Sequence, residues 1–270
     1  MTDWRYTSGM VRAMVLAFAG LLAWISLAWG QKPSDADIAA LIERGRQKAL
    51  EYTRSLPDFA CTEVVHRYSA PSDGQRTGGW NATDTLAIKL RYSQGKEEHH
   101  LELINGKATD RKYDELSGAT STGEFGGILR MIFNPDSQAA FEWESWKNVR
   151  KHRTAVYQYA VSAAHSPYYL RYQGRQAVVG IHGALEIDSE TAEVLHFNYI
   201  AYDIPTNLNL QSTVTSVDYD FADVGGRSYL LPVRSETEMH GSMIWVRNKM
   251  EFREYRKFSA DSVIDFGVGK

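Results

Sequence analysis

The sequence predicts a mostly β protein of the α+β class, in which a curved antiparallel sheet of about ten strands forms an incomplete β-barrel. An N-terminal helix and one inserted helix complete the predicted fold. Three observations carry this prediction. Apolar and polar residues alternate with a period of two over most of the chain, hairpin-turn signals separate the alternating stretches, and aromatic residues make up 12% of the chain. Alternation is typical of half-buried strands, and aromatic side chains suit a pleated surface.

Residues 1–30 have the three parts of a secretory signal peptide. Arg5 and Arg12 give a positive start, a long apolar run follows, and Ala28 and Gly30 form a small-x-small cleavage site. Cleavage after Gly30 predicts a periplasmic or secreted protein. The alternative is an uncleaved anchor, because the run is near the lower limit for crossing a bilayer core of about 30 Å. In that case the protein contacts the membrane only through this segment.

Residues 31–270 are expected to form a single β domain. The chain has a formal net charge of −3 and no basic-aromatic motif, so we expect no binding to nucleic acid. Cys61 is the only cysteine, which excludes a disulfide within the chain. Stability must therefore come from a buried core, and Cys61 is expected to be a small buried residue rather than a nucleophile.

A helix is predicted between Ser34 and Leu56. Ser34 is a suitable N-cap, and Asp35 and Asp37 follow in the first turn, where the helix dipole favours acids. Leu56-Pro57 ends the helix, because a residue before proline avoids the α region. The helix carries an apolar stripe at helical spacing, made of Ile38, Leu41, Ile42, Ala49 and Tyr52.

Strands follow from residue 60 onward, and turn signals separate them. Asn105-Gly106 and Gly225-Gly226 predict tight hairpins, and residues 188–191 predict another turn. Residues 69–82, rich in Ser, Pro, Gly and Asp, predict one long loop. The alternating apolar positions are Leu86, Ile88, Leu90 and Tyr92; Leu101 and Leu103; Val179, Ile181, Leu185 and Ile187; Leu195, Phe197, Tyr199 and Ala201; Val217, Tyr219 and Phe221; and a last strand from about Met243 to Phe258.

A second helix is predicted within the series of strands. Ser121 and Glu124 fit a capping box, and Asn134-Pro135 ends the segment. Its apolar positions lie at helical spacing and are expected to cover a face of the sheet: Phe125, Ile128, Leu129, Ile132 and Phe133.

No pattern in the sequence predicts catalytic, metal-binding or cofactor-binding residues. Residues 118–123 resemble a nucleophile elbow, but their spacing is off by one and no parallel sheet precedes them. His99 and His100 are adjacent, so a strand points them to opposite faces. Asp218, Asp220 and Asp223 depart from a calcium loop and are expected on a solvated face.

One long strand near the C-terminus carries a basic face. It could contact anionic lipid headgroups or an envelope protein, or it could be an edge strand that charge protects from pairing. Its members are Arg247, Lys249, Arg253 and Lys257, with Trp245 and Tyr255 beside them.

The chain resembles the LolA-like periplasmic proteins in two hairpins. Residues 183–195, with Ile187-Asp188-Ser189-Glu190-Thr191 at their centre, resemble a "W-I-D-x-x-T-x-x-V-L" hairpin, although Leu185-Glu186 stands where a Trp is common. Residues 224–232 resemble a "v-d-G-x-x-L-P" turn and strand. The resemblance implies an incomplete barrel lined by apolar residues and covered by helices, whose cavity holds acyl chains, lipids or a partner's peptide. It implies no catalytic residues.

The leading hypothesis is a non-enzymatic binding protein for a lipid, an acyl chain or a lipidated partner. The alternative is an envelope protein–protein interaction module that uses its outer face or a sheet edge. A core filled by side chains would leave no room for a ligand and is the other interpretation of the same apolar pattern. The residues predicted to contact the ligand are Leu185, Ile187, Leu195, Phe197 and Tyr199.

Overall fold

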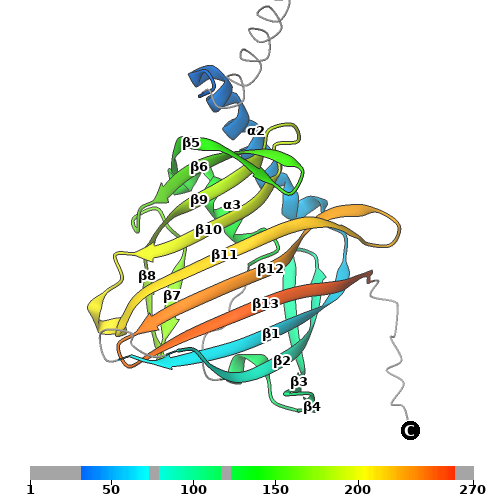
Figure 1. The fold of residues 1–270 in the computed structure, drawn as a ribbon, viewed down its shortest axis with the longest axis vertical. Helices are drawn as coiled ribbons and strands as arrows, with labels where there is room; N and C mark the ends of the chain where they lie inside the picture. The colour runs from blue at the N-terminus through cyan, green and yellow to red at the C-terminus, as the bar shows by residue number, and fades with distance from the viewer. Residues whose placement is uncertain (1–31, 73–78, 117–122, 259–270) are drawn as a thin grey trace, which may run out of the picture. The chain divides into compact units, whose positions relative to one another are not determined.

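The computed structural model describes residues 32–72, 79–116 and 123–258 (Figure 1). The chain divides into two compact units, residues 1–40 and 41–270, and each is described by itself. The predicted signal peptide lies outside the described residues. None of the described helices is long and apolar enough to cross a membrane.

The first unit contains the start of helix α2 (Asp35–Ser55). The Ser34 hydroxyl accepts a hydrogen bond from the Asp37 N–H at 3.2 Å, which satisfies one of the free donors at the start of a helix. The predicted N-cap is therefore confirmed. The helix ends at Ser55, just before Leu56-Pro57, as predicted.

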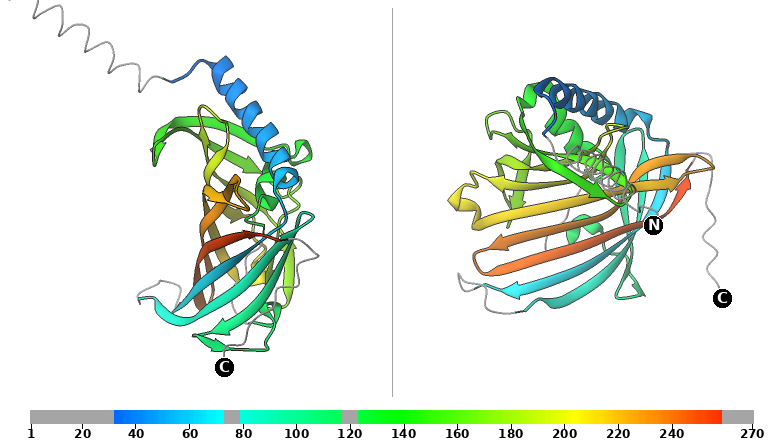
Figure 2. Two further views of the ribbon diagram at one scale, coloured as in Figure 1. Left: turned by 90° about the vertical axis from the view of Figure 1, so that its right-hand side faces the viewer. Right: turned by 45° about the horizontal axis from the view of Figure 1, so that its top comes forward.

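The second unit is built on one antiparallel sheet of eleven strands, which does not close into a barrel (Figures 1 and 2). The order is β4-β3-β2-β1-β13-β12-β11-β10-β9-β6-β5, so β4 and β5 form the two edges in the part of the chain that the structure describes. The predicted class, a mostly β incomplete barrel, is confirmed. The strands are β1 (Phe59–Pro71), β2 (Asn81–Ser93), β3 (Lys96–Ile104), β4 (Lys107–Ala108), β5 (Ala140–Val149), β6 (His152–Val161), β9 (Gly180–Asp188), β10 (Val194–Tyr202), β11 (Leu210–Asp223), β12 (Ser228–Gly241) and β13 (Ile244–Lys257).

Shorter elements connect and cover these strands. A separate hairpin pairs β7 (Tyr169–Tyr172) with β8 (Arg175–Val178). Helix α3 (Gly127–Phe133) is the predicted inserted helix. Three single turns of 3₁₀ helix complete the set: η1 (Tyr113–Glu115), η2 (Pro135–Ser137) and η3 (Thr206–Leu208).

The first and last long strands lie side by side in the sheet. β13 pairs with β12 on one side and with β1 on the other, where Val65 lies opposite Met250. The interpretation of the last strand as a charge-protected edge is therefore wrong. Its backbone groups are bonded on both sides, so charge is not needed to keep it from pairing with another chain.

Two predicted hairpin turns are confirmed by their backbone. Asn105 and Gly106 have φ of 50° and 74°, and Gly225 and Gly226 have φ of 65° and 85°. Positive φ at both central residues belongs to the turn whose twist matches that of paired strands. The predicted long loop over residues 69–82 is wrong, because β1 and β2 extend into it and Ser69 pairs with Asn81.

Helix α3 begins later than predicted. Its N-cap is Gly126, with φ of 91°, and Glu124 lies buried ahead of the helix. Ser121, the other half of the predicted capping box, lies outside the described residues. A Cβ at Gly126 would lie 2.4 Å from a ring carbon of Tyr52, so the glycine lets α3 approach α2 closely. The predicted apolar positions that are buried on α3 are Ile128, Leu129, Ile132 and Phe133.

One face of the sheet, here called the inner face, carries the core. Phe125, just before α3, packs against Phe59 and Phe252 of this face, with ring centroids 5.2 and 5.5 Å apart. Cys61 is buried in the same cluster, as predicted, and burial raises the pKa of its thiol. A second cluster lies beside the β7–β8 hairpin and is formed by Leu170, Val179, Ala201, Leu208, Leu210 and Met239.

Candidate ligand-binding site

The five residues predicted to contact a ligand gather on the inner face of β9 and β10. Phe197 lies directly opposite Leu185, and Ile187 lies opposite Val194. All five are buried, with exposed fractions from 0 to 3%. Leu195 occupies an irregularity in the register between Val194 and His196. The structure therefore brings together the five residues that the alternating pattern predicted on one face of the sheet. Other protein atoms cover all five.

Helix α2 and neighbouring aromatic rings form this cover. A Cβ at Gly45 of α2 would lie 3.1 Å from the Ile187 Cδ1 atom, so the helix backbone comes close to the sheet at this point. The Phe197 ring stacks on Tyr199 and on Tyr219, with centroids 6.2 and 6.0 Å apart. The predicted ligand contacts are thus occupied by the protein's own side chains in this form.

A cavity of about 190 Å³ lies next to these residues, between α2, α3 and strands β10 to β12. On the sheet, Val194 and Tyr219 line it, and they lie next to the residues predicted to contact the ligand. Charged side chains line one part of it: Lys48, Glu51 and Glu193. Its apolar lining comes from Ala49, Leu129, Val194, Tyr219 and Leu230. Polar and apolar groups thus line the cavity about equally, and most of the apolar ones lie on the sheet and on α3.

The sequence of α2 explains why a cavity remains under it. Its buried positions are Leu41, Gly45 and Ala49, spaced by four residues, and two of them have almost no side chain. The helix is held at separate points along its length. The Tyr52 hydroxyl donates to the Leu230 carbonyl at 2.8 Å, and Arg44 donates to the Ser189 carbonyl at 3.1 Å. Gly45 lets the helix approach the sheet, whereas the short side chain of Ala49 leaves space beside it.

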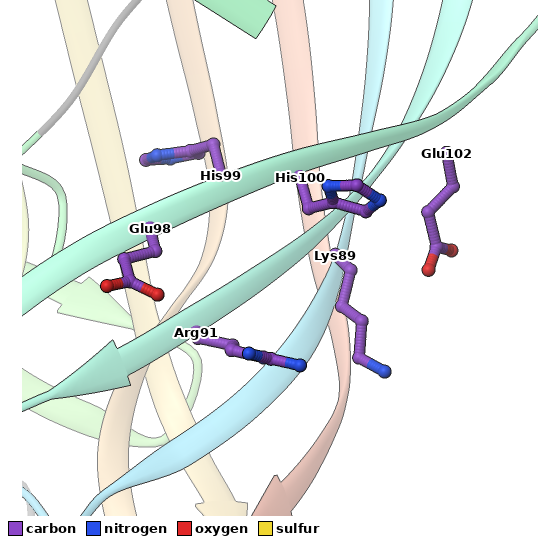
Figure 3. A pocket seen from close by; sticks show the side chains of 6 residues that line it. All are labelled: Lys89, Arg91, Glu98, His99, His100 and Glu102. Carbon is purple, nitrogen blue, oxygen red and sulfur yellow. The ribbon is translucent and has the colours of Figure 1, made fainter. Parts of the chain in front are cut away.

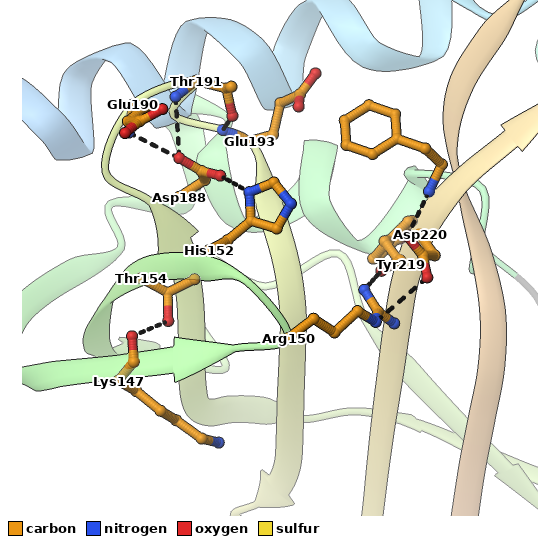
Figure 4. A network of polar contacts seen from close by, with 11 residues as sticks. Lys147, Arg150, His152, Thr154, Asp188, Glu190, Thr191, Glu193, Tyr219 and Asp220 are labelled. Atoms are coloured by element: carbon orange, nitrogen blue, oxygen red, sulfur yellow. Dashed lines mark hydrogen bonds and ion pairs between the residues drawn. The ribbon is translucent and has the colours of Figure 1, made fainter.

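The hairpin that carries the family resemblance has a structural role. The buried Asp188 carboxylate accepts hydrogen bonds from the N–H groups of Glu190 at 2.7 Å and Thr191 at 3.1 Å (Figure 4). It also lies 2.6 Å from the His152 Nδ1 atom on β6. Asp188 therefore satisfies the backbone of the β9–β10 turn, on which Arg44 of α2 docks. The motif thus fixes the turn to which α2 is attached beside the cavity.

Buried acids on the inner face are a feature that sequence reasoning missed. Glu63 is 1% exposed, and its Oε2 atom lies 3.5 Å from the His99 Nε2 atom. Glu97 accepts a hydrogen bond from the Gly123 N–H at 3.1 Å, ahead of α3. Burial, then the nearby Glu124 carboxylate, raise the pKa of Glu97 to about 7. Glu63 and Glu97 occupy inward positions of strands with alternating polarity. A charged residue at an inward position is the sequence signal that could have predicted these buried acids.

These acids do not form a metal centre among the described residues, where no group of three or more His, Cys, Asp or Glu could hold an ion. Burial raises the pKa of Glu63 and lowers the pKa of His99 to about 4. Both shifts favour the neutral forms in this apolar surrounding. The acid cluster near residue 220 has cationic partners, since Asp218 lies 2.7 Å from His196 and Asp220 lies 3.3 Å from Arg150.

Two of the four cations predicted on the basic face of β13, Arg247 and Lys249, pair with acids of its neighbour β12. Arg247 donates to Glu238 at 2.7 Å and lies 3.2 Å from Glu236, and Lys249 lies 3.8 Å from Glu236. Tyr255 is not part of this face, because its ring packs 5.5 Å from the core residue Phe59. The strand changes its alternation at Glu254, which has a φ of 60°, and the sequence does not mark that irregularity.

One arrangement on the outer face resembles a nucleophile, a base and an orienting acid. The Ser212 hydroxyl lies 2.9 Å from the His240 Nδ1 atom, and the His240 Nε2 atom lies 3.2 Å from Glu238. The indole of Trp245 stacks on the imidazole, with centroids 3.8 Å apart. None of these side chains lines the cavity under α2. We assign them no catalytic role.

No protein-family model matches this chain, and no curated protein matches it in sequence. Among solved structures, it is similar to a domain named for outer membrane lipoprotein sorting from Vibrio parahaemolyticus. The identity is 10% and the TM-score 0.36, over 84% of this chain and 94% of that chain. It is also similar to a DUF1329 family protein from Desulfovibrio piger, with 8% identity and a TM-score of 0.39, over 82% of this chain and 94% of that chain.

The predicted resemblance to lipoprotein-sorting proteins is thus found among solved structures. At these TM-scores the likeness supplies no argument about function.

Proposed function

We propose that this protein is a non-enzymatic binding protein that holds an apolar ligand between α2 and the inner face of its sheet. The ligand class is an acyl chain, either of a lipid or of a lipidated partner. The observation that carries the proposal is the cavity of about 190 Å³, which has an apolar floor and lies under a helix with small buried residues. The predicted contact residues adjoin that floor.

The size of the cavity defines how binding would proceed. Ligand pockets usually enclose about 300–1,000 Å³, which is larger than this one. The cavity in this form accommodates the end of one apolar chain. Deeper entry would move α2 away from Ile187 and place the chain against the five predicted residues. Each methylene buried there contributes about 0.8 kcal/mol, which offsets the lost contacts of the helix.

The expected location is the periplasm or the extracellular space. Support comes from residues 1–30, whose charge and hydropathy pattern is that of a secretory signal. A carrier of acyl chains suits that compartment, because lipids and lipidated proteins must cross an aqueous space there without exposing their chains to water.

The alternative function, an interaction module that uses the basic face of β13, has weaker support. Arg247 and Lys249 already have acidic partners on β12, so a partner's acids would have to compete with Glu236 and Glu238. Exposed ion pairs of this kind contribute about 0–1 kcal/mol each, so ion pairs formed with this face would add little to a partner's affinity.

The proposal is tested by filling the cavity from the helix side. Ala49→Phe places a ring in the cavity, whereas Gln47→Phe places the same ring on the exposed side of α2. We expect Ala49→Phe to weaken binding of a fluorescent sixteen-carbon fatty acid by about tenfold or more, because the ring occupies the volume that the chain requires. Gln47→Phe should bind as the wild type does.

Two further measurements keep this test decisive. Thermal unfolding followed by circular dichroism shows whether Ala49→Phe is folded, and Val194→Phe fills the same cavity from the sheet if it is not. Native mass spectrometry of the mature protein purified from its own envelope, followed by organic extraction, identifies a co-purifying acyl species. Equal fatty-acid binding by the folded cavity-filling variants and the wild type would contradict the proposal.

A further inference from the structure

A second and larger cavity lies on the opposite, outer face of the sheet, over β2 and β3. Its volume is about 470 Å³, within the range of small-molecule sites. Figure 3 shows five of its side chains on one side of the two strands, while the imidazole of His99 projects from the other side. The five are Lys89, Arg91, Glu98, His100 and Glu102.

The strand β2 supplies two cations to this cavity. Lys89 and Arg91 are two residues apart, so their side chains leave the same face of the strand about 7 Å apart. Ala60 of β1 pairs with Arg91 on one side and with Arg256 of β13 on the other.

The cations repel one another in the absence of a bound anion. Burial lowers the pKa of Lys89. The Glu102 carboxylate, the next largest influence, raises it, and the smaller effects of Arg91 and Arg256 lower it. Arg91 rests on the ring of Phe258, with its guanidinium carbon 5.2 Å from the centroid. Among the residues that the structure describes, neither Arg91 nor Glu98, directly opposite it on β3, forms an ion pair. A guanidinium with an open fork suits a phosphate or carboxylate.

The strand β3 supplies the opposite charge. Glu98 and Glu102 flank His100, and all three side chains are exposed. A ligand with negative charge alone would meet these two carboxylates as well as the two cations. A ligand that carries both signs would meet a partner for each, with its anion over β2 and its cation over β3.

We propose that this outer cavity binds a small zwitterion in which a phosphate lies next to an amine. The phosphate would bridge Lys89 and Arg91, and the ammonium group would lie against Glu98, which is directly opposite Arg91 on β3. Such a group occurs free in solution and as the headgroup of a membrane lipid. The site is separate from the cavity under α2, because it lies on the other face of the sheet and shares none of its residues.

The test uses the mature protein and three soluble probes: O-phosphoethanolamine, inorganic phosphate and ethanolamine. We expect titration calorimetry to show that O-phosphoethanolamine binds about tenfold more tightly than either single-charge probe. Arg91→Gln should weaken that binding by about tenfold, because it removes a charge-assisted hydrogen bond. Arg171→Gln, an exposed arginine on β7, is the matched control and should bind as the wild type does.

Glu98→Gln tests the acidic half of the site, which would hold the ligand's ammonium group. It should remove most of the preference for O-phosphoethanolamine over phosphate. The proposal is overturned if Arg91→Gln binds O-phosphoethanolamine as the wild type does, or if phosphate alone binds as tightly as the zwitterion.

A vesicle experiment then separates the sources of the ligand. Co-sedimentation with phosphatidylethanolamine vesicles, competed by O-phosphoethanolamine, supports a lipid headgroup, and binding of the soluble probe alone supports a free zwitterion. Fatty-acid binding in the Arg91→Gln variant should equal that of the wild type, so failure at this site is distinguishable from failure of the proposed acyl-chain function.

Discussion

Glu97 shows at the scale of one residue how the inner face combines burial with charge. Its carboxylate accepts the Gly123 N–H and so holds the backbone that leads into α3. The same burial, together with Glu124, penalises its ionised form. An acid that is both a hydrogen-bond acceptor and a buried charge makes the attachment of α3 depend on pH.

The raised pKa of Glu97 predicts the direction of that dependence. The pKa is about 7 in the folded protein, and an exposed glutamic acid has a pKa of about 4.3. The folded state therefore holds its proton more tightly than the unfolded state. The stability from this group is present below about pH 4.3 and is lost as the pH rises through 7, by up to about 4 kcal/mol.

Glu97→Gln should remove this contribution because the amide keeps an acceptor and carries no charge. We expect the free energy of unfolding to rise by about 1–3 kcal/mol at pH 8 and to change little at pH 5. Urea unfolding at the two pH values measures it. Glu98→Gln, the exposed neighbour, is the control. A Glu97→Gln variant that loses stability with pH as steeply as the wild type would refute the assignment.

At the scale of the elements, the β9–β10 hairpin depends on one close approach of backbones. A Cβ at Gly183 would lie 2.1 Å from the Asn198 carbonyl oxygen across the strand pair. The Asn198 side chain also accepts the Ala184 N–H at 3.0 Å, which holds the two strands at this separation. Only a residue without a side chain fits between them.

Gly183→Ala should therefore destabilise the protein by about 2–3 kcal/mol, since backbone atoms must shift to admit one methyl group. Thermal unfolding of the variant measures the loss. Gly79→Ala is the matched control, because a Cβ there would meet nothing within 4 Å. Equal melting temperatures for the two variants would show that the hairpin can relax around the added atom.

At the scale of the whole second unit, a polar row crosses the inner face from β11 to β2. Its members are consecutive register partners on five adjacent strands: Thr215, Thr237, Asn248, Arg67 and Asp84. The hydroxyl oxygens of the two threonines lie 3.0 Å apart. At the other end the Arg67 Nε atom donates to Asp84 at 2.6 Å, and both side chains are largely buried. The row ties strands that are distant in sequence into one register.

The Arg67–Asp84 pair predicts a strong coupling. Arg67→Met leaves a largely buried carboxylate without its guanidinium, which should cost about 3–5 kcal/mol. The double variant with Asp84→Leu should recover much of that loss, because both charges are then absent. Arg247→Met, which breaks a more exposed pair on the outer face, should cost about 1 kcal/mol or less. Urea unfolding of the wild type, Arg67→Met, Asp84→Leu and the double variant measures the coupling energy. Losses of stability that add up in the double variant would contradict the prediction.

Much of the fold could be predicted because its signals are local. Ser34 and Pro57 mark the ends of α2, and the two glycine-containing turns mark hairpins, each within a few residues of chain. Alternation also placed Leu185 and Phe197 on one face, where the structure has them opposite each other. Physical rules with a range of two to four residues are sufficient for these features.

The ligand-binding contacts themselves stay a prediction. The sequence indicated an apolar face, but it did not indicate that Gly45 brings α2 against that face or that a cavity remains beside Ala49. The outer cavity was not predicted either, although the residues that line it all lie on two neighbouring strands, β2 and β3.

The sequence by itself determined the strand-rich class, the two helices and which side chains turn inward, because each depends on neighbours along the chain. Tertiary structure decided that β13 is a central strand, that Tyr255 faces the core, and that Glu63 and Glu97 are buried. The physical reason is that pairing between β1 and β13 joins segments far apart in sequence. Their register depends on the packing of the whole sheet, which no short stretch of residues encodes.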